Sequence, residues 1–376
     1  MLVAFCLFKY FPYGGLQRDF LRIAKTVESR GHQVRVYVQS WEGDKPDSFE
    51  IIFVPTPALT NHGQGRQFAD WVHAHLAKHP ADVLVGFNKM PGLDVYYAAD
   101  VCYKLKVDSS KQGLKGLLYR LTPRYRHFSH FEEETYGRGR KTRLMMIAQS
   151  QITDFTKYYN TEPERFVLLP PGIAPDRRYS NRPAGLGERF RRENGITPDA
   201  LMLLQVGSDF ARKGVDRSIR AIAALPQDVR RRVVYITVGQ DAPEKFQALA
   251  GELGVKDNVR ILAGRSDVPD MLAAADVFLH PAYSENTGTV ILEAVAAGVP
   301  LIVTACCGYA FHVEKSGAGL VVDEPDLQGN LNRALARLLT DDSFRAQCAA
   351  NARRYADTED LYSMPEKAAD VILSLT

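Results

Sequence analysis

Residues 285–300 read Glu-Asn-Thr-Gly-Thr-Val-Ile-Leu-Glu-Ala-Val-Ala-Ala-Gly-Val-Pro, and the rest of the chain can be arranged around them. Two carboxylates, Glu285 and Glu293, bracket a turn of small residues and an apolar helical stretch. A strand-like run, 276–280, comes just before them. This order predicts that Glu285 lies in a loop after a strand and that Glu293 lies on the first exposed face of the following helix.

The loop has the features of an anion-binding site. Thr287 and Gly288 are suited to open the helix, and the N–H groups at a helix N-terminus attract negative charge. A nucleotide sugar suits such a site because its diphosphate would face the helix end. Glu285 would then accept hydrogen bonds from sugar hydroxyls, and Glu293 would clamp the two ribose hydroxyls. Asn286 and Thr287 lie where a pocket would admit glucose, galactose or an N-acetylhexosamine.

The spacing Glu-x7-Glu, continued by Ala-x-Ala-x-Gly-x-Pro from Ala294 to Pro300, resembles the donor-site signature of the retaining glycosyltransferases of family 4. Glu-x7-Glu alone is common by chance, and the Ala/Gly/Pro continuation makes the match specific. The resemblance implies the GT-B architecture, in which two Rossmann-like domains face a cleft. It also implies a UDP-sugar as donor substrate, with no cofactor.

Composition bounds the class of protein. The 376 residues exceed one ordinary core, so we predict two domains of roughly 150 to 200 residues each. The formal net charge of only +3 gives no indication of a nucleic-acid partner. The five cysteines form no C-x-x-C pair, so we expect neither zinc nor disulfides, and a reducing cytosol fits. No run approaches the ~20 apolar residues of a membrane span, so any membrane contact would be peripheral.

Strand-like and helical runs alternate along the chain, which predicts an α/β protein with doubly wound parallel sheets. One series ends in the proline-rich segment 169–173, and a second begins at 201–207. The resemblance implies that a terminal helix crosses back to the first domain. We therefore predict an N-terminal Rossmann-like domain facing acceptor and membrane, a C-terminal Rossmann-like nucleotide-sugar domain and a crossing helix, over 1–172, 173–358 and 359–376.

Two glycines, Gly14 and Gly15, follow the first strand and open the first helix. Glycine lets a backbone approach a phosphate closely at such a turn. The run is not G-x-G-x-x-G, so NAD is a poor fit, and a plain strand-to-helix turn is the alternative. Asp19, one helical turn further on, would reach the rim of the cleft or remain a solvated helix residue.

Two adjacent cations, Arg212 and Lys213, stand between a strand ending at Gly207 and the helix that begins at Val215. At that position they would neutralise a pyrophosphate and stabilise the charge on a departing nucleoside diphosphate. The run resembles the phosphate-contacting Arg/Lys turn of family 4. Because no Asp-x-Asp occurs in the chain, a metal-dependent mechanism is not supported, and the two cations would replace the metal.

Three further polar residues lie at strand ends. By resemblance, Arg265 would flank the nucleotide base. Asp100 is a candidate for holding a sugar hydroxyl or the acceptor, or else a helix-capping or solvated residue. Related enzymes often place a histidine near this point, and this chain has none there. His280 is interpreted as a packed strand-end histidine, with no catalytic role.

The segment 103–131 is strongly basic, with Asp108 as the only acid from Tyr103 to Phe131. Leucines recur in it at helical spacing until Pro123, which predicts a short amphipathic helix with a cationic flank. Such a helix would dock on an anionic membrane surface, whereas the alternative is a solvated face packed on its own domain. The cations are Lys104, Lys106, Lys111, Lys115, Arg120, Arg124 and Arg126.

The stretches 5–19, 40–44, 88–94 and 118–121 extend the likeness, so the chain resembles the lipopolysaccharide core heptose I glucosyltransferases over essentially its whole length. The resemblance implies transfer of glucose from UDP-glucose to the first heptose of the inner core, with retained anomeric configuration. It also implies a cytoplasmic enzyme, peripheral on the cytoplasmic face of the inner membrane. The expected partners are the UDP-sugar, the inner-core acceptor and the anionic membrane.

No two carboxylates are evidently placed as nucleophile and acid/base, so we favour same-face displacement in which the leaving diphosphate helps remove the acceptor proton. Asp19, Asp100, Arg212, Lys213 and Glu285 are the candidate catalytic residues. A sugar-nucleotide epimerase is the enzymatic alternative. A non-catalytic membrane-associated scaffold that keeps this fold is the other, although the intact Glu285, Glu293, Arg212 and Lys213 argue against it.

Overall fold

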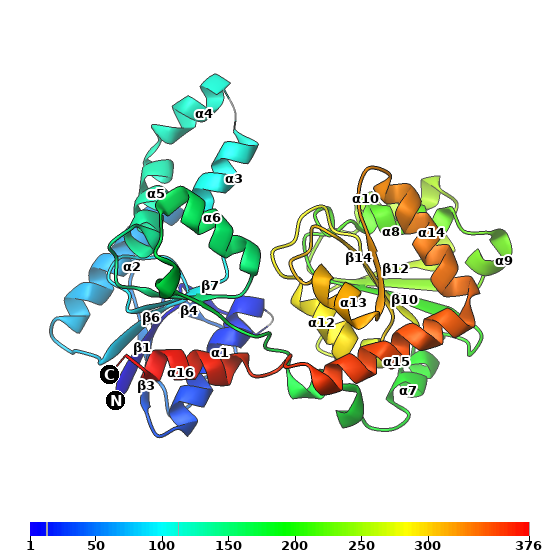
Figure 1. Cartoon of the computed structure of the whole chain (residues 1–376), viewed down its shortest axis with the longest axis horizontal. Helices are drawn as coiled ribbons and strands as arrows, with labels where there is room; N and C mark the ends of the chain where they lie inside the picture. Colours follow the sequence, from blue (N-terminus) through cyan, green and yellow to red (C-terminus); the bar gives the residue numbers. More distant parts are fainter. Residues whose placement is uncertain (13, 112, 376) are drawn as a thin grey trace. The chain divides into compact units, whose positions relative to one another are not determined.

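The computed structural model describes residues 1–12, 14–111 and 113–375, and it divides the chain into two compact units. The first unit consists of residues 1–172 together with 363–376, and the second of residues 173–362 (Figure 1). The last helix therefore belongs to the first unit, and both chain ends lie there.

A seven-stranded parallel sheet forms the centre of the first unit, in the order β5-β3-β1-β6-β7-β8-β9. Val3 of β1 pairs with Val34 on one side and Val83 on the other, so the central strand is buried on both edges. A short second sheet pairs β2 with β4. The strands are β1 Leu2–Cys6, β2 Lys9–Tyr10, β3 Gln33–Val38, β4 Ser40–Trp41, β5 Glu50–Phe53, β6 Val83–Gly86, β7 Val95–Ala98, β8 Arg143–Met146 and β9 Phe166–Leu168.

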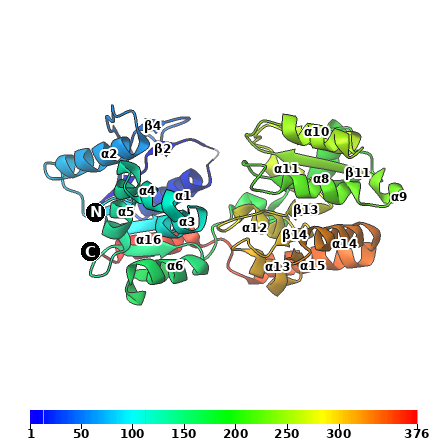
Figure 2. The same cartoon turned by 90° about the horizontal axis from the view of Figure 1, so that it is seen from above.

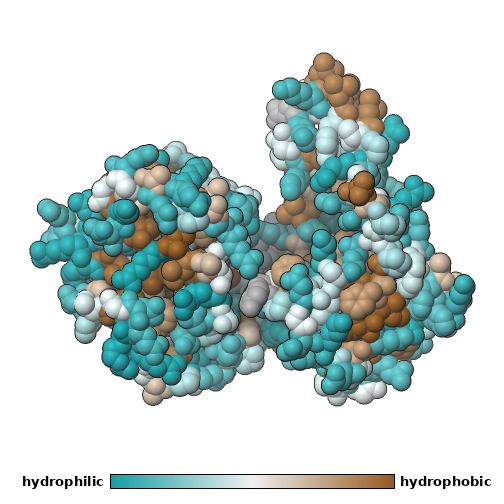
Figure 3. All heavy atoms as spheres, turned by 180° about the vertical axis from the view of Figure 1, so that it is seen from behind, coloured by the Kyte–Doolittle hydropathy of each residue, from teal (hydrophilic) through white to brown (hydrophobic). Residues whose placement is uncertain are grey.

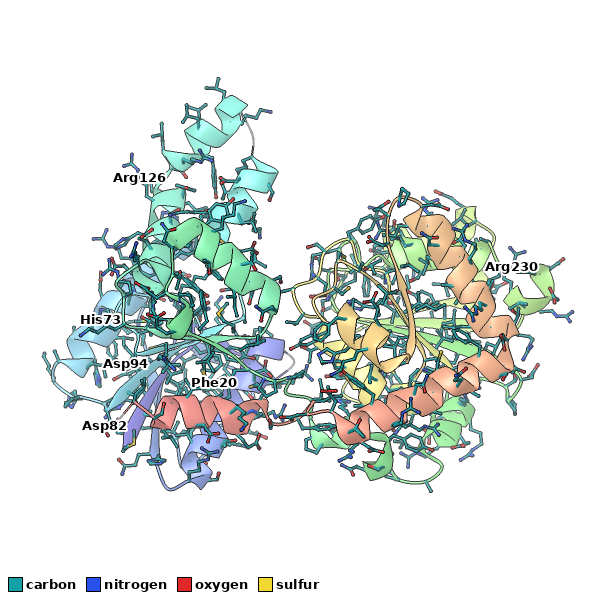
Figure 4. The ribbon with its side chains drawn as sticks, viewed as in Figure 1. Phe20, His73, Asp82, Asp94, Arg126 and Arg230 are labelled. Atoms are coloured by element: carbon teal, nitrogen blue, oxygen red, sulfur yellow. The ribbon has the colours of Figure 1, made fainter. Side chains whose placement is uncertain are left out.

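Helices cover both faces of this sheet, as Figures 1 and 2 show, which explains why its central strands read as continuous apolar runs. Phe20 of α1 is fully buried and packs edge-on against Phe5 and Phe87 (Figure 4). The terminal helix α16 packs beside α1, where Arg30 and Asp370 form an ion pair at 2.8 Å. The helices are α1 Gly15–Ser29, α2 Asn61–Leu76, α3 Tyr103–Ser110, α4 Gly113–Arg120, α5 Pro123–Tyr136, α6 Gln149–Tyr159, the 3-10 turn η1 Pro163–Arg165, and α16 Met364–Leu373.

Helices α3, α4 and the start of α5 project from the first unit, and we call residues 103–126 the protrusion (Figure 1). Four leucines at its tip, Leu114, Leu117, Leu118 and Leu121, have exposed fractions of 71%, 59%, 57% and 60%. Figure 3 shows apolar atoms gathered at this tip. The predicted amphipathic helix is present, and its apolar stripe is not packed on its own unit.

The second unit is built on a six-stranded parallel sheet in the order β12-β11-β10-β13-β14-β15. This is a doubly wound topology, because the chain moves outward from β10 in one direction and then returns to the other side at β13. Both predicted Rossmann-like sheets are therefore confirmed. The strands are β10 Leu201–Val206, β11 Val233–Val238, β12 Val259–Leu262, β13 Val277–His280, β14 Leu301–Thr304 and β15 Gly319–Val322.

Helices also flank this sheet on both faces (Figure 2). The helix α12 after the loop 281–288 is almost entirely buried, with Ile291, Leu292 and Val295 at 0% exposure. The helices are α7 Leu186–Glu193, α8 Val215–Ala223, α9 Gln227–Arg230, α10 Glu244–Glu252, α11 Val268–Ala274, α12 Thr289–Ala296, α13 Ala310–Ser316, α14 Leu327–Thr340 and α15 Asp342–Thr358, with 3-10 turns η2 Pro175–Arg177, η3 Tyr179–Asn181 and η4 Lys256–Asn258.

Candidate active site

Two loops meet at the point where the second sheet reverses its strand order. The turn 207–214 leaves β10 and the loop 281–288 leaves β13, and these two strands are neighbours. Ligands of doubly wound sheets bind outside the carboxyl ends of the strands at such a reversal. Gly214 has a φ of +72°, and a Cβ on it would lie 2.0 Å from the Pro281 carbonyl oxygen, so only glycine permits this approach. The Tyr283 amide donates to the Arg212 carbonyl at 2.8 Å and joins the loops directly.

The carboxylate of Glu285 gathers three basic side chains. Its Oε2 contacts the Lys213 ammonium, and it lies 3.5 Å from Nη1 of Arg212 and 3.3 Å from Nε2 of His280. The side chains of Lys213 and Glu285 are each 11% exposed, and that of His280 is fully buried. The structure therefore brings together Arg212, Lys213 and Glu285, which were predicted from distant parts of the sequence.

The Lys213 ammonium loses its proton at a lower pH than is usual for lysine. Burial, and to a smaller extent the neighbouring Arg212, lower the pKa of its ammonium to about 8. The Glu285 carboxylate opposes this effect because an adjacent anion favours the charged form. Lys213 is therefore a cation at neutral pH. The carbonyl of Lys213 accepts a hydrogen bond from Nε2 of Gln205 at 2.8 Å, which fixes the backbone beneath it.

Arg212 is the more exposed of the two cations, with 40% of its side chain accessible. Its Nε donates to Asp209 at 2.7 Å, and its Nη1 donates to the Ser284 carbonyl at 2.9 Å. These bonds hold the guanidinium across the two loops. They leave it at the surface of the cluster, where an incoming anion can reach it.

His280 ends β13 beneath the cluster. Burial lowers the pKa of its imidazole well below the usual value, and Lys213 and Arg212 add to the effect, so the ring is neutral. Nε2 faces Glu285, while Nδ1 is buried without a hydrogen-bond partner among the described residues. His280 is packed, as predicted, but its contact with Glu285 was missed, since no sequence pattern links a strand-end histidine to a loop carboxylate.

Glu293 is not on an exposed face of α12, as the sequence reasoning expected. It is 6% exposed, and its Oε2 lies 3.8 Å from Nε of Arg177 in the turn η2. The prediction failed because it treated α12 as a surface helix, whereas that helix is packed on nearly all sides. Arg177 was also missed. Its distance from Glu293 in sequence gives no signal of the contact.

The predicted residues between the two carboxylates sit against a third segment. Gly288 has a φ of +79° and is the N-cap of α12. The helix begins at Thr289, whereas the sequence suggested that Thr287 and Gly288 open it. The Thr287 carbonyl accepts a hydrogen bond from the Tyr309 amide at 2.9 Å. The Asn286 amide donates to the carboxylate of Glu285 at 3.2 Å. The residues after β14 therefore support the loop from behind.

Arg265 is not drawn into the ion cluster. Its Nε and Nη2 donate to the carboxylate of Asp267, at 2.7 and 2.6 Å. It follows β12, the edge strand, which is two strands from β10 and so roughly 10 Å away at the usual spacing. Its predicted place beside a nucleotide base stays a prediction.

The predicted residues of the first unit lie in two places, in the turn and helix after β1 and in the loop after β7. Gly14 is the extended N-cap of α1, and a Cβ on it would clash with the side chains of Gln17 and Phe11. Gly15 faces open space. Asp19 is half-buried, and its Oδ2 accepts a hydrogen bond from the Tyr97 hydroxyl at 2.8 Å. Asp100 lies exposed in the loop after β7.

A pocket of about 390 Å³ lies in the first unit just beyond the carboxyl ends of the paired strands β1 and β6, where that sheet reverses its strand order. Amide side chains and aromatic rings form most of the pocket walls. Asp19 and Asp100 are not among the described residues that line it. Sequence reasoning missed the pocket because its walls come from five separate segments. The lining residues are Leu7, Phe8, Lys9, Phe11, Leu16, Gln17, Gln39, Asn61, Gln64, Asn88 and Phe128.

Among the described residues, none of the helices has the length and apolar character needed to cross a membrane.

Comparison with known proteins places the site in a family. Residues 187–355 match the family model of glycosyl transferases group 1. The chain is 57% identical to the lipopolysaccharide glucosyltransferase WaaG of Escherichia coli K12 over 99% of its own length and 98% of the relative's. It is 33% identical to a D-inositol 3-phosphate glycosyltransferase of Salinispora arenicola, over 57% of this chain and 50% of the relative.

Solved structures show the same relationship in three dimensions. A crystal structure of WaaG, a glycosyltransferase involved in lipopolysaccharide biosynthesis, superposes with a TM-score of 0.92 at 57% identity, covering 98% of this chain and 99% of that one. Anabaena Alr3699/HepE in complex with UDP and glucose shares the fold, with a TM-score of 0.74 at 19% identity over all of both chains. Identity over nearly the whole of both chains shows that this protein is an enzyme of the group 1 glycosyltransferases and a homologue of the lipopolysaccharide glucosyltransferase WaaG.

Proposed function

We propose that this glycosyltransferase transfers glucose from UDP-glucose to heptose I of the lipopolysaccharide inner core, with retention of configuration and without a metal ion. The observation that carries the proposal is the cluster in which Glu285 contacts Lys213, Arg212 and His280 at the reversal point of the second sheet. It combines an acceptor for sugar hydroxyls with two cations for a diphosphate. A nucleotide sugar carries sugar hydroxyls and a diphosphate side by side.

The cluster explains how the site stays charged without a ligand. Two cations held close together repel each other, and burial disfavours the charge on Lys213. Glu285 offsets both effects in the ligand-free protein. When the donor enters, its diphosphate supplies negative charge, so Lys213 and Arg212 shift toward the phosphates and Glu285 becomes available to the sugar hydroxyls.

The same cations serve the chemical step. The bond from the anomeric carbon to the leaving oxygen lengthens in the transition state, and negative charge grows on the diphosphate. Lys213 is largely buried and Arg212 is held across two loops, so their positive charge is already in place when it is needed. The leaving diphosphate takes the acceptor proton on the same face, which gives retention.

Glucose is the proposed donor sugar because a relative that is 57% identical over nearly the whole of both chains is a glucosyltransferase. Asn286 and Thr287 follow Glu285 directly and carry polar side chains. Galactose differs from glucose in the configuration at C4 and N-acetylglucosamine in the substituent at C2, so one polar contact can separate them. They are the alternative donors.

We assign the acceptor sugar to the pocket of the first unit. Five neutral amides line it, Gln17, Gln39, Asn61, Gln64 and Asn88, together with aromatic rings and a single cation, Lys9. Amides donate and accept hydrogen bonds at once, as sugar hydroxyls do, and aromatic faces cover the apolar side of a sugar ring. The side chain of Asn88 is held in place, because its Oδ1 accepts a hydrogen bond from the Phe8 amide N–H at 2.8 Å.

We assign membrane contact to the protrusion. Its tip exposes four leucines, and cations surround them: Lys111 lies over the ring of Tyr119 at 4.3 Å, and Arg124 over Phe128 at 5.4 Å. Arg126 projects outward from α5 (Figure 4). Exposed apolar groups within a cationic surround bind the interface of an anionic bilayer. This contact would bring the enzyme to a lipid-linked acceptor at the cytoplasmic face.

Incubation of the purified protein with UDP-glucose, UDP-galactose and UDP-N-acetylglucosamine, each with and without truncated inner-core acceptor, tests the assignment. Glucose transfer that depends on acceptor, survives EDTA and gives an α-linked product by NMR is expected from an α-linked donor. Transfer only from another donor would overturn the choice of glucose. Conversion of the UDP-sugar without acceptor would indicate an epimerase instead.

The acceptor pocket has its own test. Asn61→Ala and Gln64→Ala should raise the KM for the acceptor and leave the affinity for UDP unchanged, because these residues belong to the first unit. Gln227→Ala, on α9 of the second unit, is a matched control that should change neither. An unchanged acceptor KM in both pocket variants would place the acceptor elsewhere.

A further inference from the structure

Two consecutive cysteines, Cys306 and Cys307, follow β14 directly behind the candidate donor loop. Cys306 is exposed, whereas Cys307 is 3% exposed. The Thr304 hydroxyl lies 3.4 Å from Sγ of Cys306 and 3.5 Å from Sγ of Cys307, so one oxygen holds both sulfurs. The two side chains point to the same place, although consecutive residues often point apart.

The two thiols of this pair differ in pKa and in exposure. A hydrogen bond from the Cys307 thiol to the Cys306 sulfur lowers the pKa of Cys306 to about 6, and Thr304 and Arg217 add to the effect. The same bond, together with burial, raises the pKa of Cys307. Cys306 is therefore the more acidic thiol of the pair, next to a thiol that holds its proton more tightly. Thiolate character with exposure is what makes a cysteine nucleophilic.

The pair is mechanically joined to Glu285 and its neighbours. Cys307 and Glu285 form a parallel bridge between their backbones. The Tyr309 amide donates to the Thr287 carbonyl, and a Cβ on Gly308 would lie 1.9 Å from the Asn286 carbonyl oxygen. Sγ of Cys306 also contacts the Ala282 carbonyl at 3.2 Å. Because these segments are close-packed, an atom inserted between the two sulfurs must move the loop that carries Glu285.

We propose that Cys306 and Cys307 form a dithiol site that captures trivalent arsenicals covalently, and that capture closes the donor loop to UDP. The capture rests on the two sulfurs alone, whereas its effect on UDP rests on the proposed function of the loop. In the reaction with an aryl arsenoxide, two As–S bonds form and the As–O bonds break. The arsenic oxygen leaves as one water with two protons, one from the Cys307 thiol and one from the Cys306 thiol or, where that sulfur is ionised, from solvent. Arsenic and sulfur keep their oxidation states, so no oxidant is needed.

The other cysteines are poor competitors. Cys6, Cys102 and Cys348 are all buried, and none is followed or preceded by a second cysteine. Burial raises the pKa of each of these thiols, to about 11 for Cys102. A trivalent arsenical needs two thiols within reach of one atom. Cys306 and Cys307 are the chain's one pair of consecutive cysteines, and the Thr304 hydroxyl contacts both of their sulfurs.

Phenylarsine oxide and the full chain provide the test, read by intact mass spectrometry. We expect one phenylarsenic group per chain, retained in an excess of monothiol and removed by a dithiol. The Cys306→Ser variant should lose the adduct, and the matched Cys348→Ser variant, which removes a buried cysteine of the same unit, should keep it. A Cys306→Ser protein that still binds one group would overturn the site.

UDP binding separates the two parts of the proposal. The adduct should weaken UDP affinity by about tenfold or more, the scale of overpacking a close-packed site. UDP added first should slow the capture. An adduct that forms and leaves UDP affinity unchanged would refute the coupling to the donor loop. If the unmodified protein does not bind UDP, the proposed function fails, while the adduct in wild type and its loss in Cys306→Ser still decide the dithiol site.

Discussion

The Glu285 carboxylate and the Lys213 ammonium form an ion pair in which each side chain is only 11% exposed. Breaking such a pair by removing one partner leaves an uncompensated charge in a poorly solvated place. At this position a second anion, the donor diphosphate, is expected to take over one partner. We propose that the ion pair is the resting state of the donor site.

Removal of either cation should reduce turnover more than donor binding. Lys213→Ala and Arg212→Ala should each lower kcat by roughly 10²- to 10³-fold, the effect of removing one preorganised stabilising group. Steady-state kinetics with and without EDTA measure this, and Arg220→Ala, an exposed arginine on α8, is the matched control. Near-normal kcat in both variants, or loss of wild-type activity in EDTA, would refute the metal-free role of these cations.

The alkaline side of the pH profile should report Lys213. Its ammonium is the useful form, and its pKa in the free protein is about 8, so kcat/KM should fall as pH rises through about 8. Bound diphosphate favours the ammonium, so the fall in kcat should come at higher pH. In Lys213→Arg the guanidinium stays charged, and the alkaline fall should vanish from whatever activity remains. If the alkaline fall in activity persists unchanged in Lys213→Arg, it reports the titration of another group.

Glu293→Ala should weaken the binding of UDP and of UDP-sugar alike, because the proposed contact is to the ribose. The loss of a charged hydrogen bond should cost about 1.5 to 3 kcal/mol, measured by titration calorimetry. The variant also leaves Arg177 without the carboxylate 3.8 Å away, so thermal stability should fall too. Glu293→Gln keeps the size and shape of the side chain, so it distinguishes the effect on UDP binding from the effect on thermal stability. Unchanged UDP affinity in a folded variant would remove Glu293 from the site.

Replacing four cations of the protrusion and its base by glutamine should lower binding to anionic vesicles without changing UDP affinity. The residues are Lys111, Lys115, Arg120 and Arg124, and each cation near such a surface contributes on the order of 1 kcal/mol. Salt should weaken the wild type in the same direction. A set of equal charge on the second unit, Arg220, Arg231, Lys245 and Lys256, is the matched control, since all four are exposed.

Leu114→Ser and Leu117→Ser provide the apolar counterpart. Both leucines are more than half exposed, so their replacement should weaken vesicle binding and leave the melting temperature nearly unchanged. Co-sedimentation with vesicles of neutral and anionic lipid measures the effect. Wild-type binding that ignores both salt and anionic lipid would show that the protrusion serves another surface.

Sequence alone determined the elements whose signal is local. The alternation of apolar runs and helical periods predicted both parallel sheets, since strands buried on both faces are continuously apolar. The spacing from Glu285 to Glu293, with its Ala/Gly/Pro continuation, indicated the family. The leucines of 114–121 predicted an amphipathic helix, because a helical stripe is written in neighbouring residues.

Tertiary structure decided which of these residues meet. Lys213 and Glu285 follow strands that are far apart in sequence, and they are neighbours only because β10 and β13 pair at the reversal of the sheet. The burial of Glu293, its contact with Arg177 and the approach of His280 to Glu285 depend on which faces of α12 and β13 are covered. The amides of the first-unit pocket are likewise assembled by strand order. Contacts between loops follow the pairing of whole strands, and no local periodicity records that pairing.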